Sequence, residues 1–101
     1  MNLGFSIMAL RHRLRKKLKG GPIIAAHSHC NDNRQELAAS EIAGCFYCCE
    51  TYPPAEIDDW IDNGQCAMCP KCGIDSVIGS ASGFPIHDKQ FLKEMNGFWF
   101  S

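Results

Sequence analysis

Hydrophobic residues recur at helical spacing at both ends of the chain. Near the N-terminus one stripe is formed by Leu3, Ile7, Leu10, Leu14 and Leu18. This stripe predicts a helix over residues 3–19, which Gly20-Gly21-Pro22 ends. Near the C-terminus, Phe91, Leu92 and Met95 predict a helix from Asp88 to about Asn96, with Gly97 as its stop. The aromatic tail Phe98-Trp99-Phe100 is expected to pack back on the core, the alternative being an exposed binding patch.

The middle of the chain predicts short elements. Thr51 can cap a helix whose first turn holds Pro53 and Pro54 and which Asn63-Gly64 ends; its apolar face is Ile57, Trp60 and Ile61. Residues 66–68 predict a strand, with residues 74–78 as its hairpin partner. Before these, residues 23–26 predict a strand, and Asn31 and Asp32 can cap a helix that reaches about Ala39.

Length and composition favour a single small domain in need of extra stabilisation. The chain has 101 residues, 46% of them hydrophobic, and seven cysteines. A domain of this size has little core, and a structural metal is a common supplement. Nothing resembles a signal peptide or a membrane span, so a reducing, cytoplasmic location is expected, in which cysteines serve as metal ligands rather than disulfides.

Charge divides the chain into two parts. Residues 1–30 contain six basic side chains and no carboxylate: Arg11, Arg13, Arg15, Lys16, Lys17 and Lys19. Residues 31–101 contain four Lys/Arg and all eleven Asp/Glu, a net charge of −7. We therefore expect a basic N-terminal helix or arm at residues 1–22 and an acidic zinc-binding domain at residues 23–101.

Two cysteine pairs, Cys45-Phe-Tyr-Cys48 and Cys69-Pro-Lys-Cys72, stand 20 residues apart. This spacing is typical of a four-cysteine zinc site, and Pro70 and Gly73 suit the turn of the second pair. Four thiolates leave no open coordination position, so one structural Zn²⁺ is expected, with iron in a rubredoxin-like site as the rival. The neighbouring Cys49 and Cys66 are alternative ligands for a shifted site.

A second metal site is also conceivable. Four further metal-binding side chains remain outside the two pairs: His27, His29, Cys30 and Cys66. The simpler interpretation is a buried thiol with surface histidines.

The chain from Ser40 onward resembles a family of small bacterial zinc-finger proteins known only as cytoplasmic proteins. The resemblance covers about 60 residues and is carried by Gly44-Cys-Phe-Tyr-Cys48, Ile57, Trp60-Ile-Asp62, Ala67-Met-Cys-Pro-Lys-Cys-Gly-Ile-Asp-Ser-Val-Ile-Gly79, Phe91-Leu-Lys-Glu-Met-Asn96 and Trp99-Phe100. It implies a small α+β zinc-binding domain with a treble-clef or zinc-ribbon core, and it brings no established activity.

A more distant resemblance is to HNH nucleases, which also flank a central segment with cysteine pairs. Those enzymes need a general-base histidine in that segment, and this chain has Trp60 there instead. No histidine lies between Cys45 and Cys72. If the chain were a degenerate nuclease, its metal or base groups would be Asp58, Asp59, Asp62 and His87.

Three functions are compatible with these features. The first, favoured by the acidic domain and the lack of a catalytic constellation, is a binding module for a protein with a basic face, contacted through Trp60, Phe98, Trp99 and Phe100. Such a module suits a phage or mobile-element regulator or inhibitor of a nucleic-acid-handling enzyme. The second is nucleic-acid binding through the arm at Arg11–Lys19. The third is the HNH-type enzyme.

Overall fold

A three-stranded antiparallel sheet divides the molecule into two halves. The computed structural model describes residues 21–100. Its sheet has the order β2-β1-β5 and contains β1 (Ala43–Cys45), β2 (Thr51–Tyr52) and β5 (Val77–Gly79). Ala43 pairs with Tyr52 on one side and with Gly79 on the other. The central strand therefore carries Cys45, the first cysteine of the first pair, into the middle of the fold.

Successive residues of the sheet face opposite sides and belong to two separate hydrophobic clusters. Cys45 and Val77 are buried on one side, together with Leu37, Ala43, Tyr52, Ile57, Ala67 and Cys69. Phe46 and Ile78 are buried on the other side, together with Ile23, Ala26, Ile86, Leu92 and Met95. This alternation is the period of two expected for β-strands. We call the two groups the cysteine-side cluster and the helix-side cluster.

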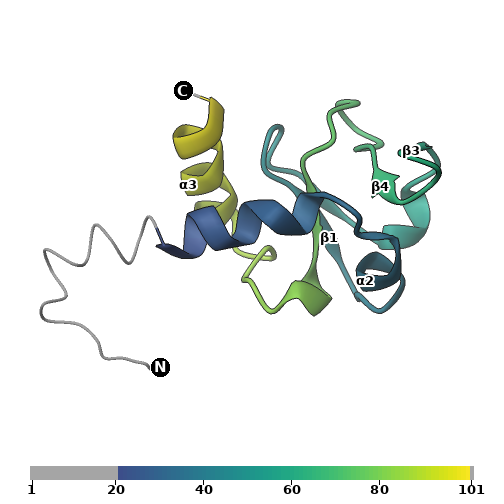
Figure 1. Cartoon of the computed structure of the whole chain (residues 1–101). Coiled ribbons are helices and arrows are strands. Elements are labelled where there is room, and N and C mark those ends of the chain that lie inside the picture. The colour runs from purple at the N-terminus through teal and green to yellow at the C-terminus, as the bar shows by residue number, and fades with distance from the viewer. Residues whose placement is uncertain (1–20, 101) are drawn as a thin grey trace, which may run out of the picture.

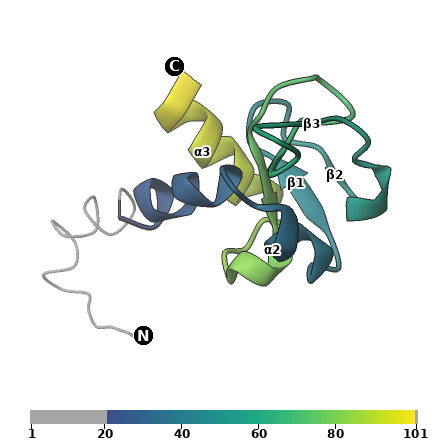
Figure 2. The same ribbon diagram turned by 45° about the vertical axis from the view of Figure 1, so that its right-hand side comes forward.

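Helices cover the helix-side cluster. Residues 21–27 are helical and are followed by the single turn η1 (Ser28–Cys30); α3 (Lys89–Phe100) packs beside them. Figures 1 and 2 both show these two helices together at one end of the molecule. Their contact includes a hydrogen bond of 3.3 Å from the Trp99 indole nitrogen to the carbonyl oxygen of Ile23.

Shorter elements surround the cysteine side. They are α2 (Arg34–Ala38), the turns η2 (Pro54–Glu56) and η3 (Ser80–Ser82), and a two-stranded hairpin of β3 (Trp60–Ile61) with β4 (Cys66–Ala67). Buried Asn33 joins these parts. Its amide nitrogen donates to the carbonyl of Val77 at 2.8 Å, and its amide oxygen accepts from the backbone N–H of Ala67 at 3.2 Å. One side chain thus connects the large sheet to the hairpin.

The predicted helix between the cysteine pairs is wrong. Only Pro54–Glu56 make a helical turn, because Pro53 is extended (φ −65°, ψ 141°) and Ile57 leaves the turn in an extended conformation. Trp60 and Ile61 then pair with β4, and the positive φ of Asn63 and Gly64 forms the hairpin turn rather than a helix cap. Pairing with a neighbouring strand has overridden the local helix pattern.

Other element predictions need correction. Residues 23–26 are helical, not extended. The segment that contains Val77 pairs with β1 and not with β4, although β4 is a strand as predicted. The helix α3 continues through Gly97 to Phe100. The helix α2 begins at Arg34 after Asn33, one residue later than an Asp32 cap would place it, and Asn33 makes no capping hydrogen bond.

The class of fold is as expected. The structure is a small α+β fold with short helices and small sheets. The predicted helix over residues 3–19 and the basic residues at positions 11–19 lie outside the described residues, and the predicted domain boundary at residue 22 stays a prediction.

Candidate metal centre

Four cysteine sulfurs converge between the two turns that carry them. The Sγ atoms of Cys45, Cys48, Cys69 and Cys72 all lie within 4.8 Å of one another. Two of these distances cross between the pairs: Cys45 to Cys72 is 3.7 Å and Cys48 to Cys69 is 3.8 Å. Zn–S bonds of about 2.3 Å in a tetrahedron place neighbouring sulfurs about 3.8 Å apart. The spacing therefore fits one tetrahedral metal ion.

The two cysteine turns have the same hydrogen bonds. In the first, the amide of Tyr47 donates to Cys45 Sγ at 3.3 Å, and in the second, the amide of Lys71 donates to Cys69 Sγ at 3.3 Å. The amide four residues after the first cysteine of each pair also returns to that cysteine's carbonyl, at 2.8 and 2.9 Å. Such N–H···S contacts stabilise thiolate ligands. We call these turns the first and second knuckle.

The residue after each knuckle has a left-handed backbone. Its φ is +80° at Gly73 and +62° at Cys49. Cys49 thus occupies the position that glycine fills in the second knuckle, which explains why no glycine follows the first pair. Its side chain packs against the helix-side cluster, away from the four converging sulfurs. The structure therefore does not support the one-residue shift that would make Cys49 a ligand.

Burial opposes ionisation of the first pair. It raises the pKa of Cys48 to about 11, and it raises the pKa of Cys45 well above the usual thiol range. For Cys69, burial acts in the same direction, but contacts from Tyr52 and from the amides of Cys72 and Lys71 outweigh it and lower the pKa to about 7. Cys69 is thus prepared to be a thiolate, whereas Cys45 and Cys48 need a cation to become thiolates.

Tyr52 is a residue that sequence reasoning missed. It is 3% exposed and packs in the cysteine-side cluster. Within residues 21–100, its hydroxyl makes no hydrogen bond of full geometry. It nevertheless lies close enough to the Cys69 sulfur to lower the pKa of that thiol. We regard this contact as an incomplete hydrogen bond. A buried donor beside the sulfurs fits a charged metal–thiolate centre better than four neutral thiols.

The conceivable second metal site does not form among the described residues. His27 stacks on Trp99 with 4.0 Å between ring centroids, and His29 Nδ1 contacts a Glu36 carboxylate oxygen at 2.8 Å. The Cys66 thiol donates to the carbonyl oxygen of Cys30 at 3.3 Å. Within the part of the chain that the structure describes, the only group of three or more His, Cys, Asp or Glu residues arranged to hold a metal is Cys45, Cys48, Cys69 and Cys72.

The acidic residues named for a nuclease centre, Asp58, Asp59 and Asp62, are exposed, and so is His87. None of them belongs to a group suited to a metal among residues 21–100.

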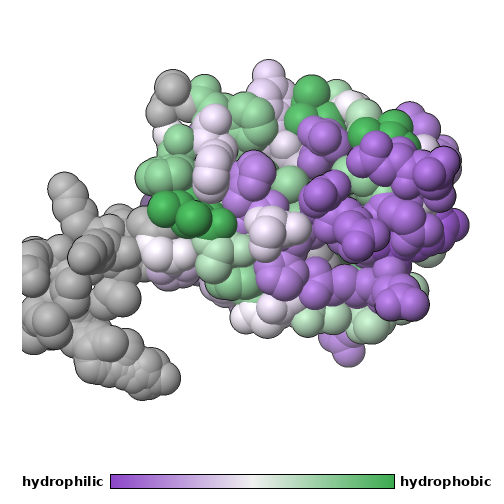
Figure 3. Space-filling view, viewed as in Figure 1, coloured by the Kyte–Doolittle hydropathy of each residue, from purple (hydrophilic) through white to green (hydrophobic). Residues whose placement is uncertain are grey.

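The aromatic residues predicted to contact a partner lie at two different ends. Trp99 is held inside by its bond to Ile23 and its stack on His27, whereas Phe98 and Phe100 are 51% and 43% exposed at the end of α3. Trp60 lies on β3, where the Arg34 guanidinium sits 4.4 Å from its ring centroid. Figure 3 shows hydrophilic residues gathered over the end that holds α2 and the β3–β4 hairpin.

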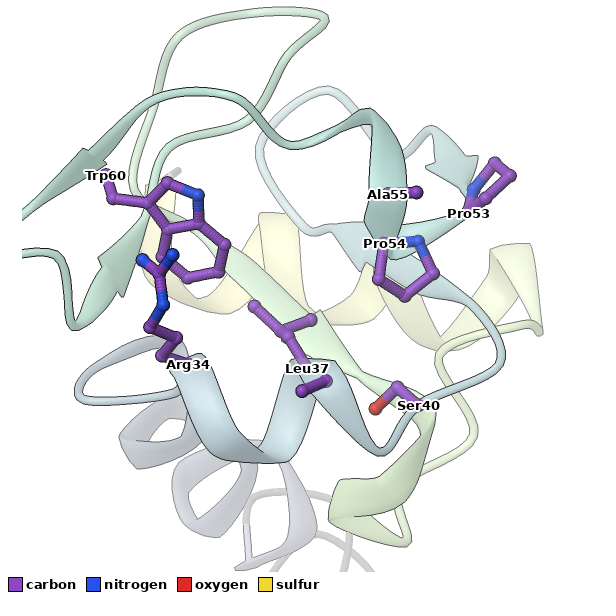
Figure 4. Close-up of a pocket in the computed structure, with 8 residues that line it drawn as sticks. Arg34, Leu37, Ser40, Pro53, Pro54, Ala55 and Trp60 are labelled. Carbon is purple, nitrogen blue, oxygen red and sulfur yellow. The ribbon is translucent and has the colours of Figure 1, made fainter.

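An open groove of about 450 Å³ lies beside Trp60. Leu37 forms its floor and points from α2 into the space between Trp60 and Pro54 (Figure 4). Besides these three residues, Arg34, Ala38, Ser40, Pro53 and Ala55 line it. Arg34 closes one end and is held there by a 2.7 Å hydrogen bond to the carbonyl of Gly64. The groove is mostly apolar inside a hydrophilic face.

None of the helices in the described part of the chain has both the length and the apolar character needed to cross a membrane. No protein-family model, curated protein or solved structure matches this chain. The resemblance to the bacterial zinc-finger family thus stays an expectation from its motifs, and the treble-clef topology a proposal.

Proposed function

We propose that this protein is a zinc-stabilised binding module that recognises a protein partner with a basic face. The metal part of the proposal is supported by four sulfurs at tetrahedral spacing on two matching knuckles. All four ligand positions are thiolates, so the metal holds the fold and takes no substrate. Zinc is chosen over iron because a closed tetrahedral site of four cysteines is one of its commonest structural sites.

The observation that carries the binding part is the charge of the described surface. Residues 21–100 contain four Lys/Arg and eleven Asp/Glu, and most of these carboxylates are exposed. Within residues 21–100, carboxylates that contact a basic side chain include Glu56 with Lys71, Glu50 with Lys89, and Glu36 with His29, and the acidic residues outnumber the basic ones by eleven to four. Uncompensated negative charge attracts a basic partner and repels nucleic acid.

The groove beside Trp60 is the part of this surface that best suits a partner's side chain. It is mostly apolar with Arg34 at one end, and exposed Asp58 and Asp59 immediately precede Trp60 in the chain. An apolar side chain flanked by basic residues would match this combination of an apolar groove and acidic neighbours.

The test is a pull-down from native lysate, followed by measurement of affinity with the purified partner. Ala38→Gln obstructs the groove from an exposed position of α2, and Ala39→Gln is the matched control because Ala39 is exposed beside it but does not line the groove. We expect a basic partner whose affinity for this protein falls with added salt. The affinity should also fall in Ala38→Gln but not in Ala39→Gln. A partner that binds both variants and wild type equally would refute the groove, and an acidic partner would refute the charge argument.

The metal is tested separately by elemental analysis of protein that has not met a chelator. One zinc per chain is expected. Protein that binds iron instead would absorb visible light through its iron–thiolate bonds. A molar ratio of metal to protein far below one, for every metal measured, would refute the proposed metal centre.

A second function, nucleic-acid binding, is favoured by one sequence observation. Residues 1–30 contain six Lys/Arg and no carboxylate. A chain without residues 1–20 should then lose retention on a DNA or RNA column, and the affinity of the full chain should fall steeply with salt. Equal, salt-insensitive retention of both chains would refute this function.

A further inference from the structure

The two knuckles match in their backbone but differ in one side-chain contact. The first sulfur of each knuckle receives one amide N–H at 3.3 Å. Cys69 also has the buried hydroxyl of Tyr52 beside it. The hydroxyl comes from β2, the strand paired with β1, so the sheet that carries Cys45 also delivers a donor to the opposite knuckle.

The Tyr52 hydroxyl is in an unusual state. It is buried, and within residues 21–100 it is the one buried side-chain polar atom without a hydrogen-bond partner. An unpaired buried donor is costly, because it has lost its hydrogen bonds to water without gaining a partner in the protein. A neutral thiol is a poor acceptor, whereas a thiolate bound to a metal is a strong one. A metal-bound Cys69 thiolate would therefore supply the acceptor that this hydroxyl needs.

We propose that Tyr52 is a positioning residue of the metal centre, whose hydroxyl donates an O–H···S hydrogen bond to the Cys69 thiolate when the metal is bound. This inference rests on the proposed metal centre. The bond withdraws electron density from one of four thiolates and so lowers their mutual repulsion. It also ties the edge strand β2 to the second knuckle.

Tyr52→Phe removes the hydroxyl and keeps the ring, and Tyr47→Phe is the matched control. Tyr47 lies inside the first knuckle but is 46% exposed. We expect Tyr52→Phe to bind Zn²⁺ about tenfold more weakly or worse in competition with a chromophoric chelator, as loss of outer-shell hydrogen bonds does in other metal sites. In Co²⁺-loaded protein, the sulfur-to-cobalt charge-transfer band should move to longer wavelength, because a thiolate without its hydrogen bond gives up electrons more easily. Tyr47→Phe should change neither quantity.

The outcomes separate this inference from the proposed function. Wild type that binds no metal refutes the metal centre itself. Tyr52→Phe with one metal per chain, wild-type affinity and an unshifted band refutes the role of Tyr52 and leaves the centre intact. If Tyr52→Phe does not fold, ¹¹³Cd-loaded wild type decides. A slowly exchanging Tyr52 hydroxyl proton with scalar coupling to cadmium supports the bond, and a rapidly exchanging, uncoupled proton overturns it.

Discussion

The matching knuckles allow a backbone prediction at the residue that follows each of them. Cys49 and Gly73 occupy equivalent left-handed positions, with φ of +62° and +80°. A residue with a Cβ atom pays roughly 1–2 kcal/mol for this conformation, and glycine does not. The first knuckle thus holds strain that the second avoids, and exchanging residue types at the two positions should shift stability in opposite directions.

The magnitude follows from three variants. Cys49→Ala removes the thiol and its packing but keeps the strained backbone, so Cys49→Gly is compared with it rather than with wild type. Glycine at this position relieves roughly 1–2 kcal/mol of backbone strain, and its greater freedom in the unfolded chain costs about 0.4–1 kcal/mol. The free energy of unfolding of Cys49→Gly should therefore exceed that of Cys49→Ala by about 1 kcal/mol. Gly73→Ala should lose about the same, because a Cβ at Gly73 would meet no atom within 4 Å and adds no clash.

The assay is thermal unfolding with saturating Zn²⁺, in which 1 kcal/mol moves the midpoint by about 4–8 °C for a domain of this size. Cys49→Gly should melt above Cys49→Ala, and Gly73→Ala below wild type. The reverse order in either pair would refute the strain argument. Metal content is the companion measurement: a loss of bound zinc in Cys49→Ala would show that Cys49 is a ligand after all.

Three further predictions concern the rest of the fold. Asn33→Ala should lower the free energy of unfolding by about 3 kcal/mol in denaturant titration, because it leaves the Val77 carbonyl and the Ala67 amide unpaired; Gln35→Ala, on an exposed position of the same helix, should have little effect. Gly79→Ala should cost about 1–3 kcal/mol because its Cβ would overlap Ser40, whereas Gly97→Ala, with no atom within 4 Å, should stabilise α3 by up to about 1 kcal/mol; a common sign would contradict this reasoning. Removal of the metal by a chelator should abolish the circular dichroism of the folded domain, because zinc contributes about 10 kcal/mol or more and the whole stability of a small domain is about 5–15 kcal/mol.

The features that the sequence predicts well are those set by neighbouring residues. Each knuckle is a turn of a few residues, so the spacing of its cysteines suffices to predict it, and in the second knuckle Pro70 and Gly73 strengthen the prediction. The helix at the C-terminus follows from its own apolar stripe, although its end does not, since Gly97 continues the helix and Trp99 anchors the last turn to Ile23.

The features that were missed depend on residues far away in the chain. Thr51 to Gly64 has caps and an apolar stripe that favour a helix, yet Trp60 and Ile61 pair with β4, and the two prolines confine the helical turn to three residues. Val77 pairs with Cys45, which lies 32 residues earlier in the chain. The hydrophobic pattern around Val77 therefore cannot predict which strand it pairs with. Asn33 and Tyr52 look ordinary in the sequence, and what they do depends on the groups that the fold places opposite their polar atoms.

The sheet would transmit the effect of a metal bound on its cysteine side to the helices on its other side. Cys45 and Phe46 are adjacent but belong to the cysteine-side and helix-side clusters, and Val77 and Ile78 do the same on β5. Neither cluster can lose its sheet residues without displacing those of the other, because successive residues of a strand move together. Strands of two or three residues are too short to hold a sheet on their own. A metal bound by the two knuckles would therefore also fix the register of β1, and through Phe46 and Ile78 it would stabilise the surface on which the 21–27 helix and α3 pack.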